Sequence, residues 1–271
     1  FKVSYITLFT KIIIMSITRI ILAVVLLAVS IITYYASFNM SIIFITSAIS
    51  SLSFWFAVLL LIPKRFFKLV LNVKKTKAYW ISLGLYLFFH VTLYGFFYGI
   101  ILGLDIFIPV ITANYGVGIP PSSILLFPYW ESLSPSINII LLGYEDVISP
   151  FITFIGVILA LLLGANIEKV LELKREVSRR KLSTVLIGAP VIGIVSGTSC
   201  CLSLPSVIIY FVALGVGAIS SVLPILASPL YFAFVWYGLP IGSAFLLLEN
   251  LREMNKALQK LGKCEVKSVS Y

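Results

Sequence analysis

Two adjacent cysteines, Cys200 and Cys201, are the residues of this chain whose type and spacing best suit chemistry. Thiolates are soft ligands and select soft metal ions such as Cu(I) and zinc. A vicinal pair can hold one ion between its sulfurs or pass it stepwise to another thiol, and binding must displace the thiol protons. The favoured interpretation is nevertheless that both cysteines are small, buried, apolar residues at a helix contact, as free cysteines usually are. The alternative is a soft-metal site at the pair, with Cys264 of the basic tail as a weaker third ligand.

The residues around the pair read GTSCCLSLP (197–205), and FVALGVG (211–217) follows. This stretch resembles the first span of mercuric-ion transport membrane proteins, in which a Cys-Cys-Leu motif precedes a proline and an Ala-Leu-Gly segment follows. The resemblance covers about residues 197–248, a fifth of the chain. It implies a relay of a metal ion from an outer cysteine pair to a cytoplasmic pair. This chain has Cys264 alone where the family has the second pair, and four further expected spans precede the motif.

His90, the only histidine, lies in the middle of an apolar segment. An ionisable residue inside a membrane is a functional hypothesis by default. One histidine supplies neither both axial ligands of a b-type haem nor a copper centre of several imidazoles, so we expect a structural hydrogen bond. Asp105, near the outer end of the same segment, is expected to be an interfacial cap.

Motifs of common enzymes are missing from the sequence. It has no phosphate-binding glycine loop with Lys-Ser/Thr, no His-x-x-x-His, no Cys-x-x-Cys and no Gly-x-Ser-x-Gly. A nucleophile–base–orienter set needs a base, and no acid lies near His90 in sequence. The sequence therefore predicts a non-catalytic protein without a resident cofactor, unless a soft metal ion binds at Cys200 and Cys201.

The composition is that of a membrane protein. Of 271 residues, 61% are hydrophobic and only 11% are charged, with a mean hydropathy of +1.12. Soluble domains carry about 25% charged residues. Apolar stretches of about 20 residues, each long enough to cross a bilayer core, account for the difference. We therefore expect an all-α fold, a single integral membrane domain over residues 1–271.

The placement of the basic residues predicts the topology. Formal net charge is +10, and every Lys and Arg lies within residues 2–19, 64–77, 169–181 or 252–267. Basic short loops stay cytoplasmic, so both termini are expected inside, as in a multi-pass protein of a prokaryotic plasma membrane. Attraction to anionic lipid head groups accounts for these charges, and nucleic acid is not an expected partner.

Six spans satisfy this charge pattern, with seven as the alternative. They are expected at about residues 20–37, 41–62, 78–108, 147–167, 192–220 and 224–248. No small-residue cleavage site follows the first apolar run, so we expect it to be a retained span. The basic segment after Pro63 is expected to be an amphipathic helix along the inner interface.

Two segments outside the spans have their own patterns. Residues 110–146 have no Lys or Arg and are rich in Pro, Ser and Tyr, which predicts an extracytoplasmic loop of turns rather than regular helix. Its apolar run 124–127 is expected to lie on the membrane or on a neighbouring subunit. The fourth span is expected to continue through Lys181 as a solvated helix, because Glu168, Glu172 and Glu176 lie four residues apart.

Two functions remain open from the sequence. The first is an accessory or structural subunit packed against other membrane subunits, with a respiratory complex as the expected host. The second is a thiol-based transporter or handler of soft metal ions that uses Cys200 and Cys201. The bilayer is an expected partner in both.

Overall fold

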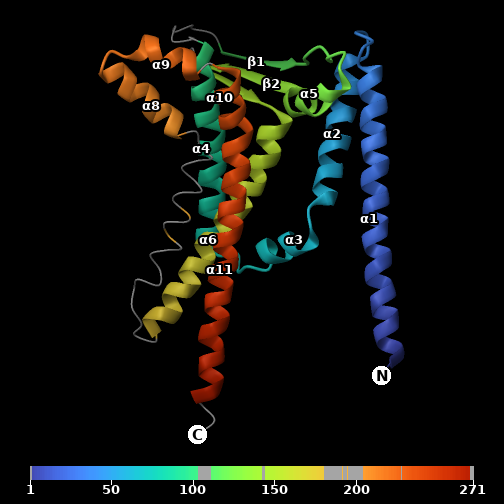
Figure 1. Ribbon diagram of the computed structural model, residues 1–271, viewed down its shortest axis with the longest axis vertical. Coiled ribbons are helices and arrows are strands. Elements are labelled where there is room, and N and C mark those ends of the chain that lie inside the picture. Colours follow the sequence, from blue (N-terminus) through green and yellow to red (C-terminus); the bar gives the residue numbers. More distant parts are fainter. Residues whose placement is uncertain are drawn as a thin grey trace. The chain divides into compact units, whose positions relative to one another are not determined.

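The computed structural model describes residues 2–102, 111–141, 144–179, 191, 194, 204–226 and 228–268 (Figure 1). Most of these residues are helical. The chain divides into two compact units, the first made of Phe1–Phe66, Ala113–Asn138 and Ile148–Phe154, and the second of Phe67–Thr112, Ile139–Val147 and Ile155–Tyr271.

A hairpin of two long helices forms most of the first unit. Helix α1 (Lys2–Ala36) and helix α2 (Ile43–Leu61) lie side by side (Figure 1). Small side chains occur where the two helices meet, as at Ser30 and Ser50, which lets the two backbones approach closely. The buried small residues are Ala23, Ser30 and Ser37 on α1, and Ser47, Ser50, Ser51, Ser53 and Ala57 on α2.

Polar bonds fix both ends of this hairpin. Near the loop between the helices, Ser37 Oγ donates to Thr46 Oγ1 over 2.8 Å. At the other end, the Arg19 guanidinium donates to the carbonyl oxygens of Leu60 and Ile62 over 2.7 and 3.0 Å. The last carbonyls of a helix have no partner within the helix, so Arg19 stabilises the end of α2.

The segment after residue 110 has regular structure, contrary to the expected loop of turns. Its elements are β1 (Ile111–Gly116), η1 (Ile124–Leu126), α5 (Phe127–Leu133), β2 (Ser136–Leu141) and β3 (Tyr144–Ile148), with the strands in the order β1-β2-β3. The all-α expectation is therefore wrong in this part of the chain. Pro128 does not break the helix, because it lies in the first turn of α5, where a missing N–H costs nothing.

The second unit contains three long helices, α4 (Lys77–Leu102), α11 (Leu239–Ser268) and most of α6 (Pro150–Arg179). Leucines such as Leu159 and Leu162 of α6 and Leu247 of α11 are fully buried in this unit. Short helix α3 (Lys64–Leu71) lies where the amphipathic helix is expected, and its Val70 is buried.

Helix α6 differs in one respect from the expected solvated extension. Its continuous helix does extend to Arg179. Glu172 is paired with Lys169 over 2.7 Å, as expected of an exposed face. Glu168, however, is 2% exposed and accepts a hydrogen bond from the Thr76 hydroxyl, so it belongs to the packed side of the helix.

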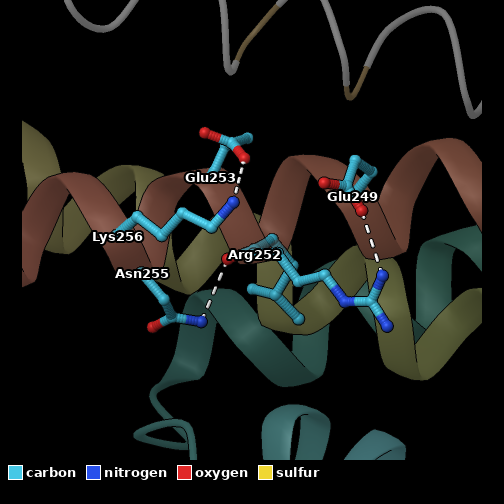
Figure 2. A network of polar contacts seen from close by, with 6 residues as sticks. Glu249, Arg252, Glu253, Asn255 and Lys256 are labelled. Atoms are coloured by element: carbon cyan, nitrogen blue, oxygen red, sulfur yellow. Dashed lines mark hydrogen bonds and ion pairs between the residues drawn. The ribbon is translucent and has the colours of Figure 1, made fainter.

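The charged end of α11 is a solvated face. Figure 2 shows the Lys256 ammonium directed at Glu253 and the Arg252 guanidinium directed at Glu249, with N–O distances of 2.6 and 3.0 Å. The Asn255 amide donates to the carbonyl oxygen of Leu251 in the same helix (Figure 2). Exposed pairs of this kind add little stability, so this face contributes mainly solubility in water.

Shorter helices occupy the region of the last two expected spans. They are α8 (Leu204–Gly215), α9 (Ile219–Leu226), α10 (Pro229–Ala233) and a π-helical segment, η2 (Phe234–Gly238). Gly217 separates α8 from α9 with a φ of 71°, a backbone conformation that glycine adopts without strain. The expected span 192–220 therefore does not continue as one helix through this turn.

Four helices among the described residues are long and apolar enough to cross a membrane. They comprise residues 17–36, 43–61, 150–178 and 229–261. The first three agree with expected spans, and the fourth begins close to the expected last span and extends beyond it. Helix α4 agrees with the expected third span as a helix, and its crossing of the bilayer stays a prediction. The count of six is not confirmed.

Candidate functional site

Cys200, Cys201 and Asp105 lie outside the described residues. Cys264 falls within α11, and its side chain is also outside what the structure describes. Within the described part of the chain, no three His, Cys, Asp or Glu residues form a group that could hold a metal ion.

His90 lies in a closely packed helix crossing in the second unit. Its side chain is 1% exposed, its Nδ1 is 3.2 Å from the Tyr86 hydroxyl, and the two rings are stacked with centroids 5.5 Å apart. On α6, Gly156 faces the imidazole so closely that a Cβ there would be 2.6 Å from His90 Cδ2. This environment supports the structural role expected for His90.

A second polar contact in this unit joins α6 to α11. The fully buried Asn166 donates from Nδ2 to the Leu247 carbonyl oxygen over 2.9 Å, and Asn250 Nδ2 donates to Asn166 Oδ1 over 2.9 Å. Polar side chains that bond across helices stabilise membrane bundles by about 0.6 kcal/mol each, with a wide range. The contact is therefore structural.

The most unusual polar group of the described chain is the carboxyl of Glu131, in the segment that the sequence predicts to be a loop. Glu131 belongs to α5, its side chain is 0% exposed, and it contacts the α1–α2 hairpin. Its Oε1 is hydrogen bonded to the Ser50 hydroxyl of α2. Its Oε2 is buried and has no hydrogen-bond partner among the described residues. Ser50 is seven residues into α2, so the carboxyl lies about 10 Å along the hairpin from the start of that helix.

The serines beside this carboxyl also bond to each other. Ser50 Oγ is 2.7 Å from the Ser30 carbonyl oxygen, and Ser30 Oγ is 2.9 Å from the Ser50 carbonyl oxygen. The two hydroxyl oxygens are 3.2 Å apart. Glu131, Ser50 and Ser30 thus form one buried polar cluster between α5, α2 and α1.

Aromatic packing holds α5 in this position. The buried side chains of Tyr34, Phe127 and Trp130 form a core, with ring centroids 5.1 Å apart for Tyr34–Phe127 and 5.3 Å for Tyr34–Trp130. Trp130 Nε1 donates to the Gly118 carbonyl oxygen over 2.8 Å. The Tyr34 hydroxyl donates to the carbonyl oxygen of Pro121. Tyr34 of the hairpin therefore contacts the segment 117–135 at Pro121, Phe127 and Trp130.

Burial changes the acidity of two carboxyls outside the helices that could span a membrane. Desolvation raises the pKa of Glu131 to about 8, although its hydrogen bonds with Ser50 and Ser30 act in the opposite direction. Desolvation likewise raises the pKa of Asp146 to about 6, against a hydrogen bond from the Val147 backbone. At neutral pH, Glu131 is therefore mostly protonated and Asp146 mostly ionised.

A cavity of about 480 Å³ lies in the first unit. Its lining is almost wholly apolar, and Trp55 connects it to the polar cluster because Trp55 Nε1 donates to the Glu131 carbonyl oxygen over 3.0 Å. The lining residues are Ala48, Ser51, Leu52, Trp55, Phe56, Leu59, Tyr115, Pro135, Ile137, Ile148, Ser149, Pro150, Thr153 and Phe154. A cavity of this size and polarity suits an apolar group.

Large apolar side chains are exposed on the segment that α5 holds in place. We name the exposed side chains of Ile119, Ile124, Leu125, Leu126 and Tyr129 the outer apolar patch. Leu125 is 86% exposed and Ile119 74% exposed, and Ile124, Leu126 and Tyr129 are each close to half exposed. This patch lies outside the four helices that could cross a membrane.

The polar cluster left a weak signal in the sequence. Ser47, Ser50, Ser51 and Ser53 interrupt an otherwise apolar run, and Glu131 follows Trp130 in a segment with few charges. Serines in a span indicate a helix contact. Nothing in the sequence pairs that contact with a glutamate 81 residues further along the chain.

Comparisons of the chain with family models, curated proteins and solved structures found no match. The class of the protein therefore follows from its own fold. It is a mostly helical chain with a small sheet, and several of its helices are compatible with a membrane protein.

Proposed function

We propose that this chain is a non-catalytic, multi-pass protein of a prokaryotic plasma membrane and an accessory subunit of a larger membrane complex. Its termini lie in the cytoplasm, and the host complex is respiratory. The observation that carries the proposal is the outer apolar patch, in which Leu125 is 86% exposed although Phe127 and Trp130, two and five residues further along, are buried.

The contrast between exposed and buried neighbours supports a docking role for the patch. Monomeric soluble proteins expose few contiguous apolar residues on their surfaces. Larger exposed apolar areas mark contacts with other proteins or with a membrane. Lipid tails cover apolar side chains on a span, whereas this patch lies outside the four described helices that could cross a membrane. A neighbouring subunit that packs on Leu125 removes this apolar area from water.

The cavity in the first unit supports the same proposal. Its apolar lining, which includes Leu52, Phe56 and Phe154, accepts apolar side chains of a neighbour. Binding of a neighbour's side chains in this cavity would increase the apolar area buried between the two subunits, and it requires no catalytic activity of this chain.

Co-purification with substitution of the patch tests the proposal. Tagged wild-type protein, extracted from its source membranes in mild detergent, is expected to purify with partner subunits in fixed stoichiometry. Leu125→Asp is expected to remove them, because a carboxylate in an apolar contact must be desolvated. Ser122→Asp, at an exposed neighbouring position, adds the same charge and is expected to retain them. Loss with both variants or with neither contradicts a docking role for the patch.

A further inference from the structure

We infer that Glu131 is a proton-binding site, at which a carboxylic acid donates its hydrogen to Ser50 and keeps the segment 117–135 docked on the α1–α2 hairpin. This inference goes beyond the proposed function and does not depend on it. It follows from the number of hydrogens in the buried cluster.

The three shortest oxygen–oxygen contacts in the cluster each need a hydrogen, whereas the fourth, between the two hydroxyl oxygens at 3.2 Å, is longer than an ordinary O–H···O bond. The three shortest contacts join Ser50 Oγ to the Ser30 carbonyl oxygen, Ser30 Oγ to the Ser50 carbonyl oxygen, and Ser50 Oγ to Glu131 Oε1. Each serine hydroxyl carries one hydrogen, and a carbonyl carries none. If Glu131 is ionised, the two serine hydroxyls supply only two hydrogens for these three contacts. One of the contacts would then join two oxygens with no hydrogen between them, and those oxygens would repel each other.

A proton on Glu131 resolves this shortage. The hydrogen on Oε1 then points to Ser50 Oγ, that of Ser50 to the Ser30 carbonyl oxygen, and that of Ser30 to the Ser50 carbonyl oxygen. Oε2 becomes the carbonyl oxygen of a neutral acid. A buried neutral carbonyl without a donor costs far less than a buried carboxylate oxygen without one, which agrees with the absence of a partner for Oε2 among the described residues.

The surroundings of the carboxyl also favour the neutral form. The described groups that contact it or act on it electrostatically are Ser30 and Tyr34 of α1 and Ser50 of α2. Trp55 of α2 bonds to the backbone carbonyl of the same residue. No cation occurs in this set, and Tyr34, its only titratable member, is a phenol that is neutral near neutral pH.

Docking of the segment is therefore linked to the proton. Glu131 in an undocked, hydrated segment ionises near its ordinary pKa of 4.5, whereas the docked residue holds its proton to about pH 8. Between these values only the docked state binds the proton, so the undocked fraction rises by up to about tenfold for each pH unit. Below this window, and again above it, the fraction is independent of pH.

Infrared titration of the purified protein in lipid tests the proton directly. The carbonyl stretch of a protonated carboxylic acid is expected near neutral pH, and it should disappear with a midpoint near pH 8. Glu131→Gln should remove this band. Asp146→Asn, which removes the other buried carboxyl with a raised pKa, should retain it. A band that is unaffected by Glu131→Gln, or no such band at neutral pH, would overturn the inference.

Hydrogen exchange of the peptide 127–133 tests the linkage to docking. Wild-type protein and Glu131→Gln are compared at the same pH, so that the intrinsic exchange rate cancels. The side-chain amide that Glu131→Gln introduces can still donate to Ser50, so this variant is expected to stay docked at every pH. The ratio of wild-type to variant exchange should rise through pH 5 to 8 and then level off. A ratio that is constant with pH would contradict the linkage even if the infrared band is found.

Discussion

Single side chains determine how closely the helices of the second unit approach one another. Gly156 lies against the imidazole of His90, and Gly164 lies against the ring of Tyr79, where a Cβ would be 2.9 Å from Cε2. Because neither glycine has a side chain, an almost fully buried ring of α4 fits against each of them. The role of these residues is to allow contact between α4 and α6, in agreement with the use of small residues in membrane bundles.

Gly156→Ala should therefore destabilise the protein. The added methyl group would lie 2.6 and 2.8 Å from His90 Cδ2 and Nε2, so the ring or the helix must shift. Overpacking of this kind costs about 1–3 kcal/mol. Thermal unfolding in detergent measures the effect. Gly84→Ala is the matched control, because a Cβ at Gly84 meets no atom within 4 Å, and its unfolding temperature should stay near that of wild type.

Substitution of the cysteine pair distinguishes between the two functions that the sequence left open. Replacing Cys200 and Cys201 together by serine should leave co-purification with partner subunits unchanged, because serine is close in size to cysteine and the accessory role needs no thiol. Loss of metal-ion uptake by cells that carry this double variant would instead favour the thiol-based alternative. Inductively coupled plasma analysis of the wild-type protein would then identify the metal.

At the scale of elements, the α1–α2 hairpin depends on a face of serines rather than on large apolar side chains. Ser47 and Ser50 are fully buried, whereas Ile45 and Leu52 of the same helix are at least 60% exposed. An apolar side chain such as Ile45 thus faces outward, as lipid requires, whereas Ser50 faces Ser30 of α1.

Ser47→Leu should separate the two helices of the hairpin. A leucine side chain does not fit in a contact where serine is 0% exposed, and forcing it in costs about 1–3 kcal/mol. Ser41→Leu makes the same change at an exposed position in the turn before α2 and should have little effect. The unfolding temperatures of the two variants in detergent make the comparison. Equal losses in both would show that hydrophobicity, rather than packing, is responsible.

Element positions could be predicted where local composition determines them. The apolar runs at 17–36 and 43–61 and the long helix that begins near residue 150 agree with expected spans, because about 20 apolar residues suffice to define one. The helix α5 could not be predicted in this way, since Pro128 is typical of a turn but here occupies a first-turn helical position that tolerates it. The strand β1 could not be predicted in this way either, because its partner β2 lies beyond the segment 117–135 and the pairing is not local.

The candidate site was less predictable than the helices. His90 was expected to make a structural hydrogen bond, and its contact with Tyr86 lies four residues away on the same helix. The Glu131–Ser50 bond joins residues 81 positions apart. Such a contact depends on how α5 packs on the hairpin through Phe127 and Trp130. The periodicity of apolar residues in the sequence does not predict this packing.

For the whole molecule, the positions of the basic residues predict which parts of the chain lie in the cytoplasm. Their clusters at residues 64–77, 169–181 and 252–267 are separated by segments without Lys or Arg. If each cluster stays in the cytoplasm, the outer apolar patch lies on the opposite side of the membrane. Its exposure would then offer a partner a docking surface outside the bilayer.

Reporter fusions test this arrangement. An alkaline phosphatase fused after Lys267 should be inactive and a green fluorescent protein there should be fluorescent, because the tail is expected in the cytoplasm. A phosphatase inserted at Ser122 should be active. An active phosphatase at Lys267 would require an odd number of crossings and would contradict the predicted topology.

Native-gel separation of mildly solubilised source membranes, with mass spectrometry of the band that contains this chain, tests the accessory role most directly. We predict migration in one stable complex with other membrane subunits in fixed ratio, which would also identify the process that the complex serves. Migration near 30 kDa, or as an oligomer of this chain alone, would contradict the accessory role.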